Sequence, residues 1–154
     1  MSAVAPEISK ALQTEIQQIE QGTDLKRVSI ISRIGMKVAS ATSSVMDADA
    51  ETASSSALIE LAERLTGSIN HGHLREIVVK ADDGFIILQF INSEFMLFGG
   101  IENQLRVGFY LEYLRNAAHR FAYILAGNQI TEELKQEIEA NKNRDQRLQE
   151  EMHA

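Results

Sequence analysis

The stretch LREIVVKADDGFIILQFINSEFMLFGG, residues 74–100, decides the fold of this chain. It holds three short apolar runs, at residues 74–81, 85–91 and 95–98, which two turn signals separate. The first signal is Asp83-Gly84, where glycine supplies the positive φ angle that a tight hairpin turn needs. The second is Asn92-Ser93-Glu94. Because neither gap has room for a helix, the three runs are predicted to be neighbouring antiparallel strands.

The second and third runs are apolar on both of their faces. An antiparallel sheet with one face in water alternates apolar and polar residues, but residues 85–88 (FIIL) and 95–98 (FMLF) do not alternate. We therefore expect helices on both faces of the sheet. The run at 74–81 alternates better and carries more charge, so it is predicted to lie at an edge.

Composition bounds the function. The 154 residues are enough for one domain that buries roughly 70% of its unfolded surface. A net charge of −7 makes nucleic acid and anionic membranes poor candidate partners. The absence of cysteine excludes disulfides, thiol catalysis and cysteine zinc sites. No apolar run approaches the roughly 20 residues that span a bilayer, and the start MSAVAPEISK lacks a secretory pattern, so a cytoplasmic protein is expected.

The remaining elements follow from the spacing of apolar residues. Ile8, Leu12, Ile16 and Ile19 are four, four and three residues apart, which predicts a helix that ends at Gly22. Residues 26–41 are predicted to form a hairpin, and residues 47–66 and 104–126 two further long helices. The expected order is helix, two strands, helix, three strands, helix.

The C-terminal part of the chain is predicted to be a separate extension. Residues 131–151 are compatible with a helix, but their apolar positions are only Leu134, Ile138 and Leu148. Such a segment has too little apolar surface to join the core. We expect a domain over residues 1–128 and a charged C-terminal helical extension over residues 129–154.

Four segments in this order resemble the Roadblock/LC7 domain. They are VSIISRIGMKVASA (28–41), SSSALIELAERL (54–65), EIVVKADDGFIILQF (76–90) and LRVGFYLEYLRNAAHRFA (105–122), with Gly108 at the position of the family's glycine. Ile34 departs from the pattern, because the family more often has an acidic residue before the turn glycine. The resemblance covers about residues 8–126.

The resemblance implies an α+β fold, with a five-stranded antiparallel sheet in the order 2-1-5-4-3 sandwiched between helices. The helix at 47–66 would cover one face, and the first and last long helices the other. The C-terminal helix predicted from residues 131–151 would be an addition to this fold. Members of the family dimerise and bind Ras-like small GTPases or motor and signalling complexes. They act as scaffolds or regulators without chemistry of their own.

The sequence contains no convincing site for catalysis, a cofactor or a metal. His71 and His73 lack an evident third ligand. The acidic run Asp47, Asp49 and Glu51 lacks the spacing of a calcium loop and suits a helix N-terminus. Gly99-Gly100 lacks the spacing and lysine of a phosphate-binding loop. His119 lies among core positions of its helix, where a structural role is the commoner one.

Two hypotheses about function therefore remain, both for a non-catalytic protein. In the first, the protein is a homodimeric regulator or scaffold for a Ras-like small GTPase and can stimulate GTP hydrolysis. The alternative is an assembly platform of a motor or signalling complex with no effect on nucleotide turnover. A GTPase activator often supplies an arginine to the transferring phosphate, and the candidates are Arg33, Arg64, Arg75 and Arg106.

The dimer interface and the binding site for the GTPase are predicted to consist of different residues. An apolar edge strand is a hazard for a monomer, and a symmetric partner removes that hazard. The predicted dimer interface consists of Ala50, Ala53, Ala57, Leu61, Ile77, Val78 and Val79. The GTPase is predicted to bind the outward residues of the 47–66 helix, namely Ser54, Ser55, Ile59, Glu60, Glu63 and Arg64.

Overall fold

The computed structural model describes residues 4–41, 48–102 and 106–127, with Ala140, Arg147 and Glu151. Its elements are helix α1 (Pro6–Gly22), strands β1 (Leu25–Ser32) and β2 (Lys37–Ser40), helix α2 (Ala48–Ser68), strands β3 (Glu76–Ala81), β4 (Gly84–Phe90) and β5 (Phe95–Ile101), and helix α3 (Val107–Leu125). The predicted order of elements is confirmed. The start of the predicted α2 helix at Asp47 and almost all of the extension at 129–154 lie outside the described residues.

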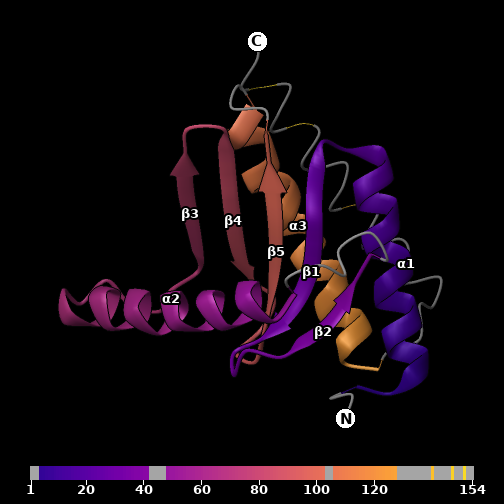
Figure 1. The fold of residues 1–154 in the computed structure, drawn as a ribbon, viewed down its shortest axis with the longest axis horizontal. Coiled ribbons are helices and arrows are strands. Elements are labelled where there is room, and N and C mark those ends of the chain that lie inside the picture. The colour runs from indigo at the N-terminus through magenta and orange to yellow at the C-terminus, as the bar shows by residue number, and fades with distance from the viewer. Residues whose placement is uncertain are drawn as a thin grey trace.

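The five strands form one antiparallel sheet in the order β2-β1-β5-β4-β3. This is the order that the resemblance implied, and it places β3 at an edge, as predicted (Figure 1). Two-residue and four-residue turns connect β3 to β4 and β4 to β5, so these strands pair with their neighbours in the chain. The centre of the sheet is β5, between β1 and β4.

Helices α1 and α3 cover one face of the sheet (Figure 1). The spacing of Leu12, Ile16 and Ile19 along α1 places all three side chains in the core, as predicted. They meet Leu114 and Phe121 of α3 and inward residues of the central strands. This face holds the larger of the two apolar cores, and it is closed by elements of the same chain.

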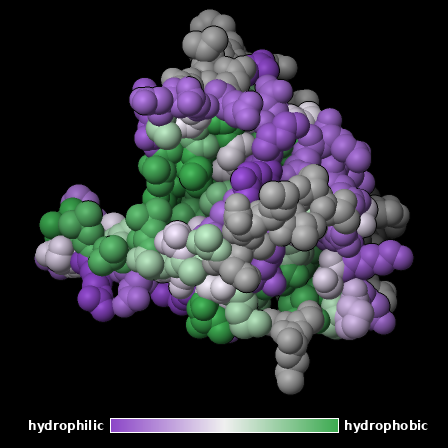
Figure 2. Space-filling model, viewed as in Figure 1, coloured by the Kyte–Doolittle hydropathy of each residue, from purple (hydrophilic) through white to green (hydrophobic). Residues whose placement is uncertain are grey.

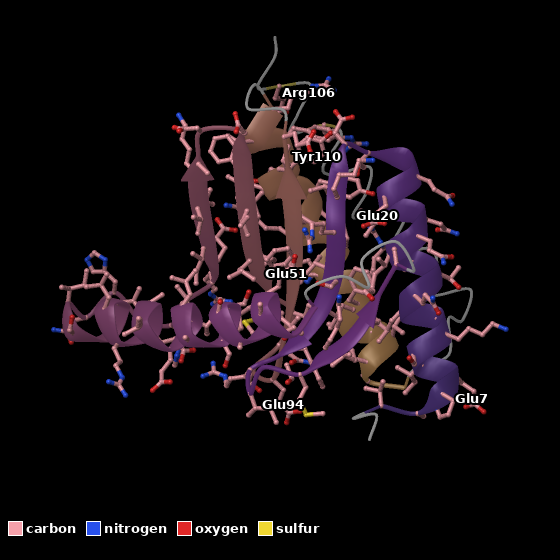
Figure 3. The ribbon with its side chains drawn as sticks, viewed as in Figure 1. Glu7, Glu20, Glu51, Glu94, Arg106 and Tyr110 are labelled. Carbon is pink, nitrogen blue, oxygen red and sulfur yellow. The ribbon has the colours of Figure 1, made fainter. Side chains whose placement is uncertain are left out.

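Helix α2 lies on the opposite face and covers only part of it. It crosses one end of the sheet, and its C-terminal half extends past β3 (Figure 1). Beneath the crossing, Ile59 packs into a second, smaller cluster with Ile31, Leu88, Met96 and Phe98. An ion pair between Arg27 and Glu51 holds the end of α2 that lies over the sheet (Figure 3).

The structure gives a different reason for Gly84 from the one predicted. Positive φ angles occur at Gly35, Gly72 and Gly127 among the described glycines, but not at Gly84. A Cβ atom at Gly84 would instead lie 2.5 Å from the carbonyl oxygen of Ile101. The β3–β4 turn therefore needs glycine because β5 approaches closely, and the predicted left-handed conformation is wrong.

Candidate functional site

A row of apolar side chains on α2 faces solvent. Ala57, Leu61, Leu65 and Ile69 are spaced by four residues, so they follow one side of the helix and the residue just after it. Leu61, Leu65 and Ile69 are 64%, 66% and 53% exposed. We call these four residues the α2 stripe. Ala50 and Ala53, which were assigned to the same interface from the sequence, are also exposed.

A second apolar area lies on the part of the sheet that α2 leaves uncovered. Val79 of β3 and Ile86 of β4 are register partners, and they are 36% and 39% exposed. They lie on the same face as Ile77 and Leu88, which pack against the α2 cluster. We call Val79 and Ile86 the open sheet surface. Figure 2 shows apolar residues gathered over β3 and β4 above α2, and again along α2 to its free end.

The β3 strand is the third feature of this region. It has a hydrogen-bonded neighbour, β4, on one side only. Of its three residues predicted for a dimer interface, Val78 and Val79 are exposed and Ile77 is half-buried against Leu88. The α2 stripe, the open sheet surface and the β3 edge are therefore neighbours on one side of the molecule.

The structure contradicts two of the residues predicted to face a GTPase. Ser55 is 5% exposed and Ile59 is 1% exposed, so their predicted outward orientation is wrong. Both lie with Thr52 on the side of α2 that faces the sheet, where three-residue and four-residue spacing brings them together. Ile59 is the large apolar side chain with which α2 fills the smaller core. Ser54, Glu60 and Arg64 are exposed, as predicted.

Glu63, another residue predicted to bind the GTPase, is engaged within the chain. It accepts two hydrogen bonds from the guanidinium of Arg33, one of them 2.7 Å long, and these bonds raise the pKa of Arg33. Arg33 also donates from Nε to the carbonyl oxygen of Ser93 at 3.0 Å, and its own carbonyl oxygen accepts from Ser56 Oγ at 2.6 Å. Arg33 thus connects α2 to the β1–β2 turn, in which it lies, and to the β4–β5 turn, which contains Ser93.

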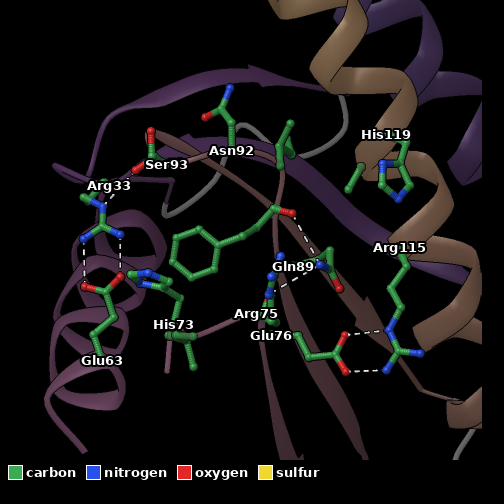
Figure 4. A pocket seen from close by; sticks show the side chains of 14 residues that line it. Arg33, Glu63, His73, Arg75, Glu76, Gln89, Asn92, Ser93, Arg115 and His119 are labelled. Carbon is green, nitrogen blue, oxygen red and sulfur yellow. Dashed lines mark hydrogen bonds and ion pairs between the residues drawn. The ribbon is translucent and has the colours of Figure 1, made fainter. Parts of the chain in front are cut away.

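A hollow of about 790 Å³ lies beside this ion pair (Figure 4). A second ion pair lines it, in which Arg115 of α3 bonds Glu76 of β3 at 3.0 Å and 2.5 Å (Figure 4). Gln89 is buried beneath, and its Nε2 donates to the carbonyl oxygens of Arg75 and Phe90, both at 3.3 Å. Sequence reasoning missed both ion pairs, because their partners are 30 and 39 residues apart and no local pattern links them.

The hollow offers few groups for chemistry. His73 and His119 line it, but the described residues contain no group of three or more side chains suited to holding a metal ion. Of the four candidate arginines, Arg33 and Arg64 pair with carboxylates, and Arg106 stacks over Phe109 at 5.6 Å. Arg75 makes no ion pair within the part of the chain that the structure describes. The exposed features of this region are mainly apolar, namely Leu61, Leu65 and Ile69 of the α2 stripe and the open sheet surface.

A five-stranded antiparallel sheet with one helix across one face and two on the other defines a small α+β domain. The sequence profile of the Roadblock/LC7 domain matches residues 12–98, and the chain belongs to this family. A comparison with curated proteins found no match. No helix in the described ranges is long and apolar enough to cross a membrane.

Solved structures with the same fold include bacterial MglB proteins. MglB of Myxococcus xanthus has a TM-score of 0.73 at 12% identity, covering 82% of this chain and 96% of that chain. The gliding protein MglB of Thermus thermophilus has a TM-score of 0.73 at 10% identity, covering 83% and 99%. A structure described as MglB with tetrameric arrangement has a TM-score of 0.73 at 12% identity, covering 82% and 98%. At these identities the likeness establishes the shared fold.

Proposed function

We propose that this protein is a homodimeric, non-catalytic regulator or scaffold for a Ras-like small GTPase in the cytoplasm. Membership of the Roadblock/LC7 family supports this assignment, because the family's members dimerise and bind such GTPases. The structure adds three features that a single chain leaves unsatisfied: the α2 stripe, the open sheet surface and the edge of β3. The proposal explains all three with one symmetric contact.

The observation that carries the proposal is the placement of α2 relative to the sheet. Half of α2 extends past β3, while the opposite end of the β3–β4 surface has no helix over it (Figure 1). A two-fold axis perpendicular to the sheet, at the β3 edge, places a second sheet beside the first with its two ends exchanged. The projecting half of each α2 then lies over the open sheet surface of the second copy, and the two α2 stripes come together.

Physical chemistry favours this arrangement. An exposed edge strand with apolar residues promotes uncontrolled pairing, and a defined partner strand removes that hazard. Homodimer interfaces are more apolar than the remaining surface, as this region is. One structure with the same fold is described as tetrameric, which supports self-association of this architecture. The small side chains of Ala50, Ala53 and Ala57 allow the two α2 helices to approach closely.

For the GTPase, we propose the outward side of the paired α2 helices. Ser54, Glu60 and Arg64 remain candidates because they are exposed. Glu60 and Arg64 form an i,i+4 ion pair that is largely in solvent, so it exchanges partners at low cost. Charged groups of this kind set orientation more than affinity. Ser55 and Ile59 are no longer candidates for contact with the GTPase, because they are buried. Glu63 is bonded to Arg33, so we assign it to holding α2 in place.

An assembly platform that leaves nucleotide turnover unchanged is the second candidate function. The engagement of Arg33 by Glu63 and by the carbonyl oxygen of Ser93 favours it, because this guanidinium is held away from a transferring phosphate. If the protein does stimulate hydrolysis, Arg75 is the arginine we propose to contribute. Single-turnover GTP hydrolysis with wild type and Arg75→Ala separates the two functions.

The first test is the molar mass by light scattering at micromolar concentration. The proposal expects twice the chain mass of 17.2 kDa, and a mass of one chain contradicts it. The second test is calorimetric binding of the cognate Ras-like GTPase, loaded with GDP or with a GTP analogue, to wild type and to Glu60→Lys/Arg64→Glu. Unchanged affinity in a double variant that still dimerises would move the GTPase site away from α2.

A further inference from the structure

The backbone of β3 presents only alternate residues to the open edge. The N–H of Phe90 donates to the carbonyl oxygen of Arg75 at 3.1 Å, and the β3–β4 register continues without a shift to Ala81. In an antiparallel pair, hydrogen-bonded and non-hydrogen-bonded residues alternate. Ile77 and Val79 therefore direct their backbone groups toward β4. Glu76, Val78 and Lys80 direct theirs toward the open edge.

Symmetry restricts how two β3 strands can pair. A two-fold axis perpendicular to the sheet makes the strands antiparallel and keeps both α2 helices on the same face. Residues directly opposite each other in an antiparallel pair project to the same face, so both must be even-numbered or both odd-numbered. The sum of the two numbers is then even, and one residue must lie opposite its own copy. For β3 the central candidates are Ile77, Val78, Val79 and Lys80.

Side-chain pairing separates these candidates. A centre on Lys80 would place two lysines opposite each other, which is unfavourable. A centre on Val79 would place Glu76 opposite Asp82 of the second copy, which is again a like-charge pair. A centre on Ile77 would place Glu76 opposite Val78 and Lys80 opposite Leu74, leaving each charge opposite an apolar residue. Each of these three registers therefore carries at least one unfavourable pair.

A centre on Val78 avoids like-charge pairs and is the one of the four in which Glu76 and Lys80 face partners of opposite charge. It places Glu76 opposite Lys80 of the second copy, twice by symmetry. It also places Ile77 opposite Val79 and Val78 opposite itself, both apolar pairs, while Arg75 lies opposite Ala81 and Leu74 opposite Asp82. Glu76 already bonds Arg115, which also pairs with Glu112, so Lys80 of the second copy would join an existing network of two carboxylates and one guanidinium.

The ends of the strand agree with this register. Arg75 and His73 precede β3, and Asp83 lies in the turn after it. With Val78 at the centre, the segment before β3, which carries His73 and Arg75, comes next to the β3–β4 turn of the second copy, which carries Asp83. Arg75 and Asp83 each make no ion pair among the residues described here. The acidic turn of the second copy would thus close one side of the hollow that His73 and Arg75 line.

We propose that two copies of this chain pair β3 with β3 in the register centred on Val78, with Glu76 opposite Lys80 selecting that register. This inference rests on the proposed homodimer and names the pairing within it. It assigns a positioning role to Glu76 and Lys80, which are not part of the apolar interface predicted from the sequence.

Disulfide trapping tests the register, because the natural chain has no cysteine. With Val78 at the centre, Ile77 and Val79 of the second copy form a non-hydrogen-bonded pair, about 4.5 Å apart at Cα, which is within the range for a disulfide. Ile77→Cys and Val79→Cys are purified separately, mixed, allowed to exchange subunits and oxidised. We expect a covalent dimer in the mixture and none in either variant alone, as read on a non-reducing gel.

Every other outcome contradicts the register centred on Val78. A covalent dimer of Val79→Cys alone means a centre on Val79, and one of Ile77→Cys alone means a centre on Ile77. Light scattering before oxidation confirms that each variant is dimeric. If Ile77→Cys does not fold, Val78→Cys replaces it. This variant should crosslink to its own copy through a short bis-maleimide. A dimer that none of these treatments links overturns the register. A wild-type monomer instead overturns the proposed homodimer.

Discussion

The two faces of the sheet are completed to different degrees. Under α1 and α3, the inward side chains of the central strands, such as Ile87 and Leu97, are fully buried. On the other face, Ile59 and Met96 are equally buried where α2 crosses, yet Ile86 is 39% exposed one residue before Ile87 in the same strand. The chain therefore finishes one face and leaves the other partly open.

The difference follows from the direction of the helices. Helices α1 and α3 lie along the sheet and use their whole apolar side against it (Figure 1). Helix α2 runs across the sheet, so only part of its length has strands beneath it. The first face should therefore set the stability of the single chain. The second should set its association, and the following variants test this division.

The largest effect is expected in the closed core. Phe121 of α3 is 0% exposed, and Phe121→Ala would leave a cavity among α1, α3 and the sheet. We expect a loss of about 3–5 kcal/mol in the free energy of unfolding, measured by urea denaturation. A loss below roughly 1 kcal/mol would mean that this face is not the main source of stability.

A smaller loss is expected beneath α2. Ile59→Ala removes the large side chain with which α2 fills its cluster, and we expect a loss of about 2–3 kcal/mol in the same experiment. Glu60→Ala, one residue further, is the control and should stay within roughly 0.5 kcal/mol of wild type because Glu60 is exposed. Equal effects of the two variants would contradict the burial of Ile59.

The next variant should affect association without affecting the single chain. Leu65→Glu places a charge in the α2 stripe, where the side chain is 66% exposed. We expect the dimer dissociation constant from sedimentation equilibrium to rise at least about tenfold, or roughly 1.4 kcal/mol. Gln18→Glu, at an exposed position of α1, adds the same charge and should leave the constant unchanged. Dissociation of both variants would indicate a general charge effect.

The smallest effect is expected at the Arg33–Glu63 ion pair, which connects α2 to the turns of the sheet. The carboxylate of Glu63 and the guanidinium of Arg33 are partly in solvent, so Glu63→Gln should lower the free energy of unfolding by less than about 1 kcal/mol. High salt should reduce the difference between variant and wild type. A loss of several kcal/mol in the free energy of unfolding would mean that the Arg33–Glu63 ion pair, and not the Ile59 cluster, holds α2 on the sheet.

Local patterns were sufficient to predict the strands, their order along the chain and the edge position of β3. The spacing of three and four residues in α1 also identified its core side chains Leu12, Ile16 and Ile19 correctly. These signals are short-range, because periodicity and turn residues act over a few positions. The sheet order itself came from the family resemblance.

The orientation of α2 could not be predicted in the same way. Its buried side includes Thr52 and Ser55, whereas Leu61 and Leu65 face solvent. Hydrophobicity normally indicates the buried side of a helix, but here part of the helix has no strand beneath it. The apolar residues of α2 therefore belong to two different surfaces, one that packs on the sheet and one that faces solvent, and the sequence pattern does not separate them. The ion pairs Arg33–Glu63 and Arg115–Glu76 depend on the finished fold and left no local signal.

Amide hydrogen exchange along β3 tests most directly whether a second copy completes the open face and edge. The amide of Val79 bonds β4 within one chain, whereas the amide of Val78 faces the edge. If the chains pair through β3, Val78 should be protected at high protein concentration and lose protection on dilution, while Val79 stays protected throughout. Fast exchange of the Val78 amide at concentrations where the protein has twice its chain mass would contradict the account.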